Sequence, residues 1–277
     1  MYEELTKTNK LIVQTFGTFL LGVFLLGALL FLPAWTLNYW QAWVFIVVFT
    51  TSVNVIGLYL ALNDPALLER RKKVGPTKEQ SPVQKFAIAV GVLALLGVFV
   101  FSALAHRFGW SPVPAYGSLA GDILVALGLF LNLLVFQENT YGGATVETMA
   151  GQKVISTGPY ALVRHPMYVG VLVMIIGIPL ALDAWWGLAI IAVATPALIW
   201  RIIDEEKLLK KDLPGYVEYA QKVRYRLVPY LYSDTSRTCA PSTRIYGCIK
   251  GRFPSSLATA KPRFYRGKFE QRSQVSL

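Results

Sequence analysis

Long apolar blocks without charge alternate with short polar connections through the first half of the chain. Residues 11–32, 41–62 and 86–105 contain no charged side chain, and residues 119–136 contain only Asp122, near the start of the block. About 20 helical residues, rising about 1.5 Å each, cross the ~30 Å hydrocarbon core of a bilayer. The pattern therefore predicts four transmembrane helices, with the Asp122 carboxylate able to reach the interface.

Two shorter apolar blocks follow, and their lengths differ from those of the first four. Residues 167–182 and 184–200 are joined by Asp183 alone, and they are interrupted by Pro179 and Pro196. Blocks of this length are marginal for a full crossing. They predict a tight helical hairpin that is tilted or does not fully span. The expected fold class is an all-α integral membrane protein with four transmembrane helices plus a C-terminal helical hairpin.

Composition agrees with a membrane protein. Of the 277 residues, 54% are hydrophobic and 16% are charged, and the mean hydropathy is +0.46. Soluble domains average about 25% charged residues. The deficit of charge is concentrated in the apolar blocks, which excludes an ordinary soluble domain.

The distribution of lysine and arginine predicts the orientation. Residues 63–85 contain six Lys or Arg, whereas residues 33–40 contain none and residues 106–118 contain only Arg107. Basic loops stay in the cytoplasm. The 63–85 connection, both termini and the segment 137–164 are therefore expected on the cytoplasmic side, together with any pocket for a soluble cosubstrate.

Both membrane surfaces carry residues suited to contact lipid. The run ERRKKVGPTKEQ, residues 69–80, is basic enough for nucleic acid, but its position in a short loop favours topology and headgroup contact. We expect membrane lipids and no nucleic acid as its partners. At the outer face, an aromatic belt is expected from Trp35, Tyr39, Trp40 and Trp43.

The segment from 137 to 166 is the longest polar connection between apolar blocks. It contains four glycines and no long apolar periodicity, which indicates a loop with a short strand at 153–155. Connections of this length in a compact protein are usually functional. At its end, Pro166 disfavours helix at His165 and creates a defined corner. Helix-start N–H groups beside Arg164 and His165 would bind an anion, or the two cations could simply anchor at the interface.

A second polar cluster follows the hairpin, in WRIIDEEKLLKKD at residues 200–212. Arg201 and Glu205 are four residues apart and share a helix face. A solvated helix end with an intrahelical ion pair would explain this pattern without any function. An antiparallel hairpin, however, brings its two ends together, so Tyr168 and Arg201 should be neighbours.

In these segments the sequence resembles the isoprenylcysteine carboxyl methyltransferases and their broader prokaryotic relatives. The resemblance rests on GQKVISTGPYALVRHPMYVG, on IWRIIDEEKLL and on LPGYVEYAQKVRYRLVP, which lie in this order over residues 147–229. The upstream NDPALLERRKKVGPTKEQSPVQK is similar to the prokaryotic members. The combined order and spacing are more specific than any one motif.

The resemblance implies an integral membrane enzyme that uses S-adenosylmethionine. It makes Arg201 the candidate catalytic residue, because this position corresponds to an arginine placed toward the lipophilic substrate. The implied cofactor-binding residues are Glu147, Gln152, Lys153, Val154, Ile155, Tyr160, His165, Pro166, Met167, Tyr168 and Glu205.

The chemistry of methyl transfer suits these residues. A carboxylate can accept hydrogen bonds from the cofactor, and tyrosine rings can face its sulfonium cation. The transfer needs alignment more than a strong acid or base. We expect no metal, since His106 and His165, the two histidines of the chain, are assigned to opposite membrane faces. The acceptor should be a lipophilic or prenylated molecule that enters from the bilayer, and Arg201 favours a carboxylate.

Three alternatives remain open at this point. A phospholipid amine N-methyltransferase would use the same cofactor. A sterol-reductase-like enzyme would have a similar His-Pro-Tyr corner but would bind NADPH. A membrane transporter or lipid-binding scaffold would commonly show internal repeats or mid-span charges, and neither is evident in the sequence.

The C-terminal tail differs in composition from the rest of the chain. Residues 233–277 contain nine Lys or Arg and two acidic residues, which is +7 of the total net charge of +11. They lack apolar periodicity, which predicts disorder. The expected domains are transmembrane helices at 1–136, the cofactor-binding loop, hairpin and cytoplasmic helices at 137–232, and the tail. Contact with anionic lipid and the absence of any selected role are both open for the tail.

Overall fold

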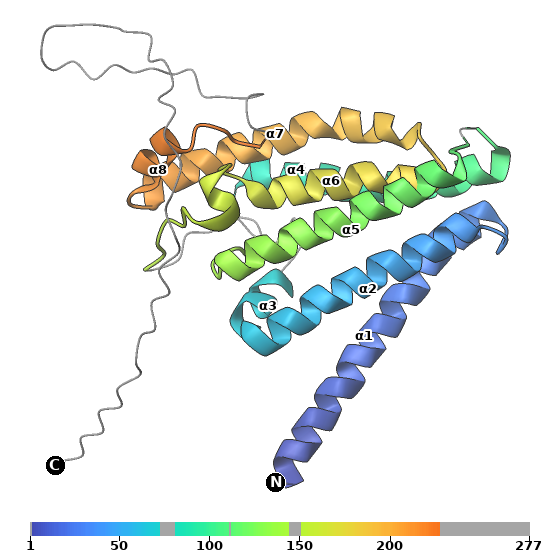
Figure 1. Cartoon of the computed structure of the whole chain (residues 1–277), viewed down its shortest axis with the longest axis horizontal. Helices are drawn as coiled ribbons and strands as arrows, with labels where there is room; N and C mark the ends of the chain where they lie inside the picture. Colours follow the sequence, from blue (N-terminus) through green and yellow to red (C-terminus); the bar gives the residue numbers. More distant parts are fainter. Residues whose placement is uncertain (1, 73–80, 111, 144–150, 228–277) are drawn as a thin grey trace, which may run out of the picture. The chain divides into compact units, whose positions relative to one another are not determined.

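The structure is a computed structural model that describes residues 2–72, 81–110, 112–143 and 151–227, with only the backbone for residues 2–16, 18 and 72. The predicted all-α class is confirmed (Figure 1). The helices are α1 (Tyr2–Ala34), α2 (Trp40–Asn63), α3 (Pro65–Lys72), α4 (Pro82–Phe108), α5 (Ala115–Glu138), the 3₁₀ helix η2 (Gly158–Ala161), α6 (Pro166–Ala181), α7 (Gly187–Asp212) and α8 (Tyr216–Lys222).

The strand expected at 153–155 is not formed, and the described residues contain no strand at all. The extended backbone there has no partner strand. Instead, the Val154 side chain packs against an apolar cluster that includes Leu213 and Tyr216. This segment is therefore held by side-chain packing.

Four described helices are long and apolar enough to cross a membrane, namely α2, α4, α5 and α7. The described apolar part of α1, Phe19–Ala34, and helix α6 are shorter. The predicted hairpin is formed by α6 and α7, but the expected interruptions of its two arms are both absent, since Pro179 lies inside the continuous helix α6. Pro196 lies inside the continuous 26-residue helix α7. Proline is tolerated in membrane helices because neighbouring groups satisfy the freed backbone.

The helices α5 and α6 lie side by side with their backbones in close contact (Figure 1). Glycines seven residues apart in each helix permit this approach. A Cβ atom on Gly128 would lie 2.5 Å from the Gly170 carbonyl oxygen, and one on Gly177 would lie 2.6 Å from the Gly121 carbonyl oxygen. Small residues let membrane helices pack this tightly. The contact fixes where α6, and the corner before it, sits on α5.

A polar network joins the helix ends opposite α8. The His106 Nδ1 atom lies 3.1 Å from the Asp183 carboxylate, which also accepts a hydrogen bond from the Val113 N–H at 2.5 Å. The Tyr39 ring stacks on His106 at 3.8 Å, and its hydroxyl donates to the Leu182 carbonyl at 2.5 Å. Tyr39 is fully buried, so its assignment to the aromatic belt is wrong. The belt tryptophans Trp35, Trp40 and Trp43 are exposed.

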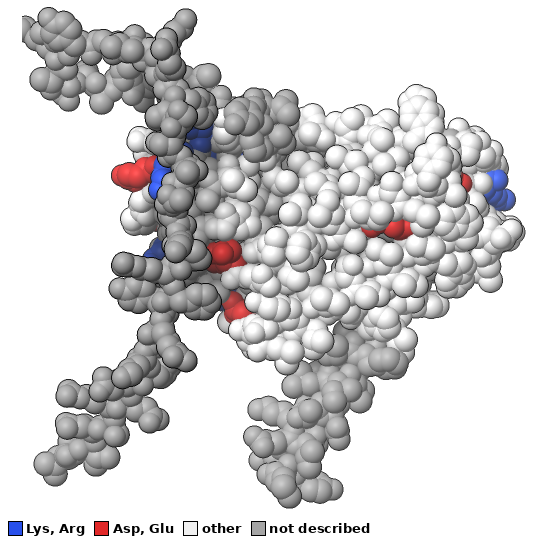
Figure 2. All heavy atoms as spheres, viewed as in Figure 1, with Lys and Arg blue, Asp and Glu red and all other residues white. Residues whose placement is uncertain are grey.

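Charged side chains gather at the end of the body that carries α8, and the flank of the helices is almost free of them (Figure 2). One correction concerns Asp122, which was expected to reach the interface. Its side chain is buried, with 5% exposure. It lies one turn after the buried Ser118, on the inward face of α5. The charged end is therefore where polar chemistry can occur in contact with water.

Candidate active site

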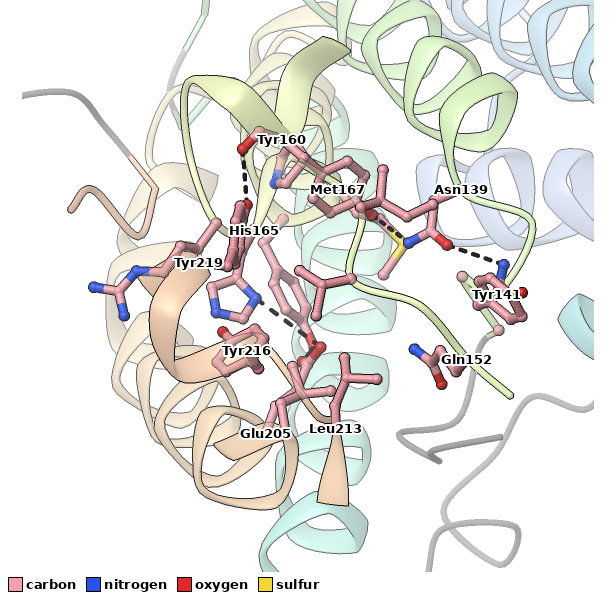
Figure 3. A pocket seen from close by; sticks show the side chains of 18 of the residues that line it. Asn139, Tyr141, Gln152, Tyr160, His165, Met167, Glu205, Leu213, Tyr216 and Tyr219 are labelled. Carbon is pink, nitrogen blue, oxygen red and sulfur yellow. Dashed lines mark hydrogen bonds and ion pairs between the residues drawn. The ribbon is translucent and has the colours of Figure 1, made fainter. Parts of the chain in front are cut away.

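A pocket opens at this charged end, between the end of α5, the start of α6, the last turns of α7 and α8 (Figure 3). It collects the proposed catalytic residue Arg201 and all but one of the proposed cofactor-binding residues. Glu147 lies outside the described residues. The others line the pocket together: Gln152, Lys153, Val154, Ile155, Tyr160, His165, Pro166, Met167, Tyr168 and Glu205.

The α7 helix brings its charges to the pocket because it is longer than the membrane is thick. Its 26 residues span about 39 Å at 1.5 Å per residue, against ~30 Å of hydrocarbon. Its charged last turns can therefore extend beyond the apolar region. Arg201 lies near this boundary and is 8% exposed.

The two arms of the hairpin meet at Tyr168, as the sequence predicted. Arg201 Nε donates a hydrogen bond to Tyr168 Oη at 2.9 Å, and Tyr168 Oη donates in turn to Glu205 at 2.7 Å. The hydroxyl thus lies between a guanidinium and a carboxylate one helical turn apart. Hydrogen bonds to charged groups are stronger than those between neutral groups. The arrangement fixes the orientation of Arg201 and Glu205 relative to α6.

The His165 imidazole lies between two carboxylates of α7. Its Nε2 atom is 3.3 Å from Glu206, and its Nδ1 atom is 4.0 Å from Glu205. The residue is 5% exposed and forms the N-cap position of α6, directly before Pro166. The corner that Pro166 predicted at His165 is therefore formed. It directs the imidazole toward the acidic residues of α7.

Behind the pocket, Glu206 forms a buried ionic cluster. Its carboxylate lies 2.9 Å from Arg164 Nη1 and 3.0 Å from Arg226 Nη2, and its side chain is 2% exposed. A buried charge is tolerated only with partners of this kind. The backbone completes the cluster, since the Arg164 N–H donates to Tyr225 O and the His165 N–H donates to Arg226 O. Residues 224–226 thereby hold the corner in place.

Tyrosines form one wall of the pocket (Figure 3). Asn139 Nδ2 donates to Tyr160 Oη at 2.7 Å, and Tyr219 Oη donates to the Tyr160 carbonyl at 2.8 Å. Burial raises the pKa of Tyr160, Tyr216 and Tyr219, so these hydroxyls stay protonated at neutral pH. Within the described residues, the buried Tyr216 Oη has no hydrogen-bond partner. It is a free donor at the pocket.

Several residues that line the pocket were not predicted from the sequence. Asn139, Tyr141 and the glycines beside them follow α5 directly, and Leu213, Tyr216 and Tyr219 come from α8 and the turn before it. A signal was present for the second group. The two tyrosines are three residues apart after Pro214 and Gly215, which predicts a short helix with one aromatic face.

A second, apolar cavity of about 240 Å³ lies between α4, α6 and α7. Small side chains of α4 leave room for it, including Gly91 and Ala94. Its walls are otherwise mainly aliphatic, and Arg201 lines it at one end. Arg201 also lines the polar pocket. Arg201 therefore lies where a polar site and an apolar cavity meet.

The described residues contain no group of three or more His, Cys, Asp or Glu side chains that could hold a metal ion. His106 and His165 belong to opposite ends of the helices, since His106 is in the last turn of α4 and His165 precedes α6.

Residues 116–213 match the sequence model of the family PEMT, phospholipid methyltransferase. The matched region runs from the start of α5 to the turn after α7, and it contains the corner, the hairpin and most of the pocket. This match supports a membrane methyltransferase as the class of the protein. The pocket-lining residues of α8 and the supporting residues of α3 and 224–226 lie outside the match.

Three relatives are similar to parts of the chain. A Delta(14)-sterol reductase from Mus musculus is 28% identical over 165 residues, 53% of this chain and 39% of the relative. The cobalt-zinc-cadmium resistance protein CzcN from Cupriavidus metallidurans is 26% identical over 48% of this chain and 60% of its own length. The nickel-cobalt-cadmium resistance protein NccN from Alcaligenes xylosoxydans xylosoxydans is 32% identical over 25% and 33%. The chain thus spans less than two thirds of each relative.

Proposed function

We propose that the protein is an S-adenosylmethionine-dependent methyltransferase that acts on a lipophilic acceptor taken from the bilayer. One observation carries the proposal. Arg201 lines both the polar pocket and the apolar cavity between α4, α6 and α7. A soluble methyl donor in the first and a lipid acceptor in the second would meet at this side chain. The basic 63–85 connection supports a cytoplasmic position for the pocket.

The residues of the pocket fit the donor. Bound S-adenosylmethionine would supply an electrophilic methyl group on a sulfonium. Glu205 can accept hydrogen bonds from the amino or hydroxyl groups of S-adenosylmethionine. Tyr216 has a buried hydroxyl with no partner among the described residues. The aromatic faces of Tyr160 and Tyr168 suit a cation or an adenine ring. Gln152, Lys153, Val154, Ile155, His165, Pro166 and Met167 supply the remaining contacts, and Glu147 is proposed as a further one.

Arg201 favours a carboxylate as the acceptor, as in a prenylcysteine-like molecule. A guanidinium orients a carboxylate through paired N–H donors and needs no proton transfer. A phospholipid amine is the competing acceptor within the same reaction class. It would have to lose a proton before it could react, and Glu205 or His165 would have to receive that proton. The Glu205 carboxylate could attract such an ammonium group, whereas Arg201, which also lines the apolar cavity, would repel it and attract an anion.

The apolar cavity favours a long hydrocarbon group on the acceptor. Its lining combines the small residues of α4 with aliphatic side chains of α6 and α7. Burying an alkyl chain there contributes about 0.8 kcal/mol per CH₂ group. A chain of several carbons would therefore provide most of the acceptor's affinity, and Arg201 would fix its head group.

Methyl transfer with radiolabelled S-adenosylmethionine tests the proposal. Purified protein in lipid nanodiscs would be given farnesylated N-acetylcysteine, the same compound as its methyl ester, and phosphatidylethanolamine. We expect label in the free acid only, because the ester has no carboxylate. Label in phosphatidylethanolamine would identify the amine enzyme instead. Absence of label and of measurable cofactor binding would contradict the proposal.

One comparison favours a second candidate, a reductase that binds NADPH, because the Delta(14)-sterol reductase from Mus musculus is similar over 165 residues. Calorimetric titration of the same preparation with S-adenosylmethionine and with NADPH separates the two functions. The methyltransferase requires saturable binding of the first ligand only. Binding of NADPH alone would support the reductase.

A further inference from the structure

The helix α3 and its two arginines contact the pocket loop from outside the family match. Leu67 is fully buried in a cluster with Leu60, Val135 and Phe136, so α3 is packed against the ends of α2 and α5. Asp64 Oδ1 accepts the Leu67 N–H at 2.9 Å and fixes the first turn. These contacts fix the position of α3 and therefore the position of Arg71 in its last turn.

Arg71 contacts two pocket-lining residues without lining the pocket itself. Its Nη1 atom donates to the Gly142 carbonyl at 2.9 Å and lies 3.4 Å from the Met167 sulfur. Its guanidinium lies 4.1 Å from the centre of the Phe136 ring, in the geometry of a cation–π contact. Gly142 and Met167 both line the pocket. One side chain thus connects α3, the end of α5, the loop after α5 and the start of α6.

The Arg71 side chain is partly buried against the loop and the end of α5, rather than extending freely toward the membrane surface. Burial lowers its pKa to about 10, which still leaves it charged at neutral pH. The neighbouring Arg70 side chain donates to the Thr140 carbonyl in the same loop. Arg70 and Arg71 were expected to contact lipid headgroups as part of this basic run, and their contacts with the loop differ from that expectation.

We propose that Arg71 is a positioning residue for the pocket: it holds the loop at 139–143 and Met167 in the arrangement that binds the methyl donor. This inference rests on the proposed function for the identity of the ligand. Within the loop the hydrogen bonds are local, and outside it Asn139 Nδ2 donates to Tyr160 Oη at 2.7 Å, so the contacts of Arg70 and Arg71 with its carbonyls add a link to α3. The Tyr141 N–H donates to Asn139 Oδ1, and the Gly142 N–H donates to Asn139 O at 3.3 Å.

The test compares Arg71→Ala and Arg71→Lys with the matched control Lys85→Ala. Lys85 belongs to the same basic connection, and its side chain is exposed. Calorimetry gives the dissociation constant of S-adenosylmethionine, and hydrogen–deuterium exchange without ligand reports on residues 139–143. Thermal unfolding reports on the fold as a whole. Lysine keeps the charge but loses the planar fork of donors.

We expect Arg71→Ala to weaken cofactor binding about tenfold or more, because the Gly142 carbonyl loses its donor and Met167 loses a neighbouring side chain. Exchange at 139–143 should rise, the melting temperature should change little, and millimolar guanidinium should restore part of the affinity. Arg71→Lys should be intermediate, and Lys85→Ala should match the wild type.

Two results distinguish a failure of the positioning role from a failure of the proposed function. Unchanged exchange and unchanged affinity in Arg71→Ala would overturn the positioning role and return Arg71 to a headgroup anchor. If the wild type binds no S-adenosylmethionine but Arg71→Ala still increases exchange at 139–143, the proposed function is overturned and the support of the loop by Arg71 stands. A parallel loss of melting temperature and affinity, without rescue by guanidinium, would overturn the inference by showing a purely structural effect.

Discussion

Tyr168 Oη accepts a hydrogen bond from Arg201 Nε at 2.9 Å, which joins the two arms of the α6–α7 hairpin at the pocket. The same hydroxyl donates to Glu205 at 2.7 Å. Arg201 is the residue shared by the polar pocket and the apolar cavity. In the proposed enzyme, Tyr168 therefore couples the residue that orients the acceptor to a residue that binds the donor.

Replacing Tyr168 with phenylalanine should reduce catalysis more than cofactor binding. The substitution keeps the ring but removes a hydroxyl that holds two charged groups, and a lost buried partner costs about 1–3 kcal/mol. We expect kcat/KM for the acceptor to fall about tenfold to a hundredfold in steady-state methyl transfer. Tyr116→Phe, at an exposed tyrosine near the start of α5, is the matched control. Equal activity in Tyr168→Phe and wild type would contradict the coupling.

Changing Arg201 to lysine should separate orientation from charge. Lysine retains the positive charge but cannot present two parallel donors to a carboxylate, and a small misplacement of a reacting group can cost about 100-fold in rate. We expect kcat/KM for a carboxylate acceptor to fall by about that factor, while the dissociation constant of S-adenosylmethionine changes less than about threefold. Arg107→Lys, at the far end of α4, controls for the substitution type. A kcat/KM that does not respond would exclude Arg201 from acceptor binding.

Local patterns predicted the apolar blocks, the hairpin and the meeting of Tyr168 with Arg201, because these follow from segment length and from the antiparallel return of a short connection. The continuity of α7 through Pro196 was not predictable, since it depends on neighbouring helices. Tyr39 was assigned to the surface because aromatic residues near helix starts usually lie there. Its burial depends on His106, 67 positions away.

The sequence predicted most of the residues that line the pocket but not the contacts that hold them in place. The corner precedes the first arm of the hairpin, and the acidic residues lie near the end of the second arm. Their convergence therefore followed from the antiparallel topology. The contacts of Glu206 with Arg226 and of Arg71 with Gly142 join segments that no local pattern relates. Contacts of this kind between distant segments depend on the packed fold and leave no periodic signal.

Replacing Glu206 with glutamine should destabilise the protein strongly. The carboxylate is 2.9 Å from Arg164 and 3.0 Å from Arg226, so the amide leaves two cations without their counter-ion. Breaking a buried ionic cluster costs about 3–5 kcal/mol, and we expect a clear drop in melting temperature in detergent. Glu218→Gln, at an exposed position on α8, should have no effect. If Glu206→Gln melts like the wild type, the cluster does not hold the corner.

A methyl group at Gly128 should force α5 and α6 apart. The added Cβ would lie 2.5 Å from the Gly170 carbonyl oxygen and from the Met174 backbone nitrogen. Overpacking of this kind costs about 1–3 kcal/mol, and α6 carries His165 and Tyr168 into the pocket. Gly128→Ala should therefore lower both the melting temperature and the affinity for S-adenosylmethionine. Gly57→Ala is the control, because nothing lies within 4 Å of its added Cβ.

Filling the apolar cavity should weaken binding of the acceptor without affecting binding of the donor. Ala94 lines the cavity, whereas Val92, two positions earlier on the same helix, is 46% exposed. Ala94→Phe would occupy space that the hydrocarbon group needs, and each CH₂ excluded costs about 0.8 kcal/mol. We expect KM for a farnesylated acceptor to rise about tenfold or more while donor affinity is retained. Val92→Phe places the same aromatic side chain on the exposed face of α4 and should leave both constants unchanged. A rise in KM that is equal in the two variants would mean that the acceptor does not use this cavity.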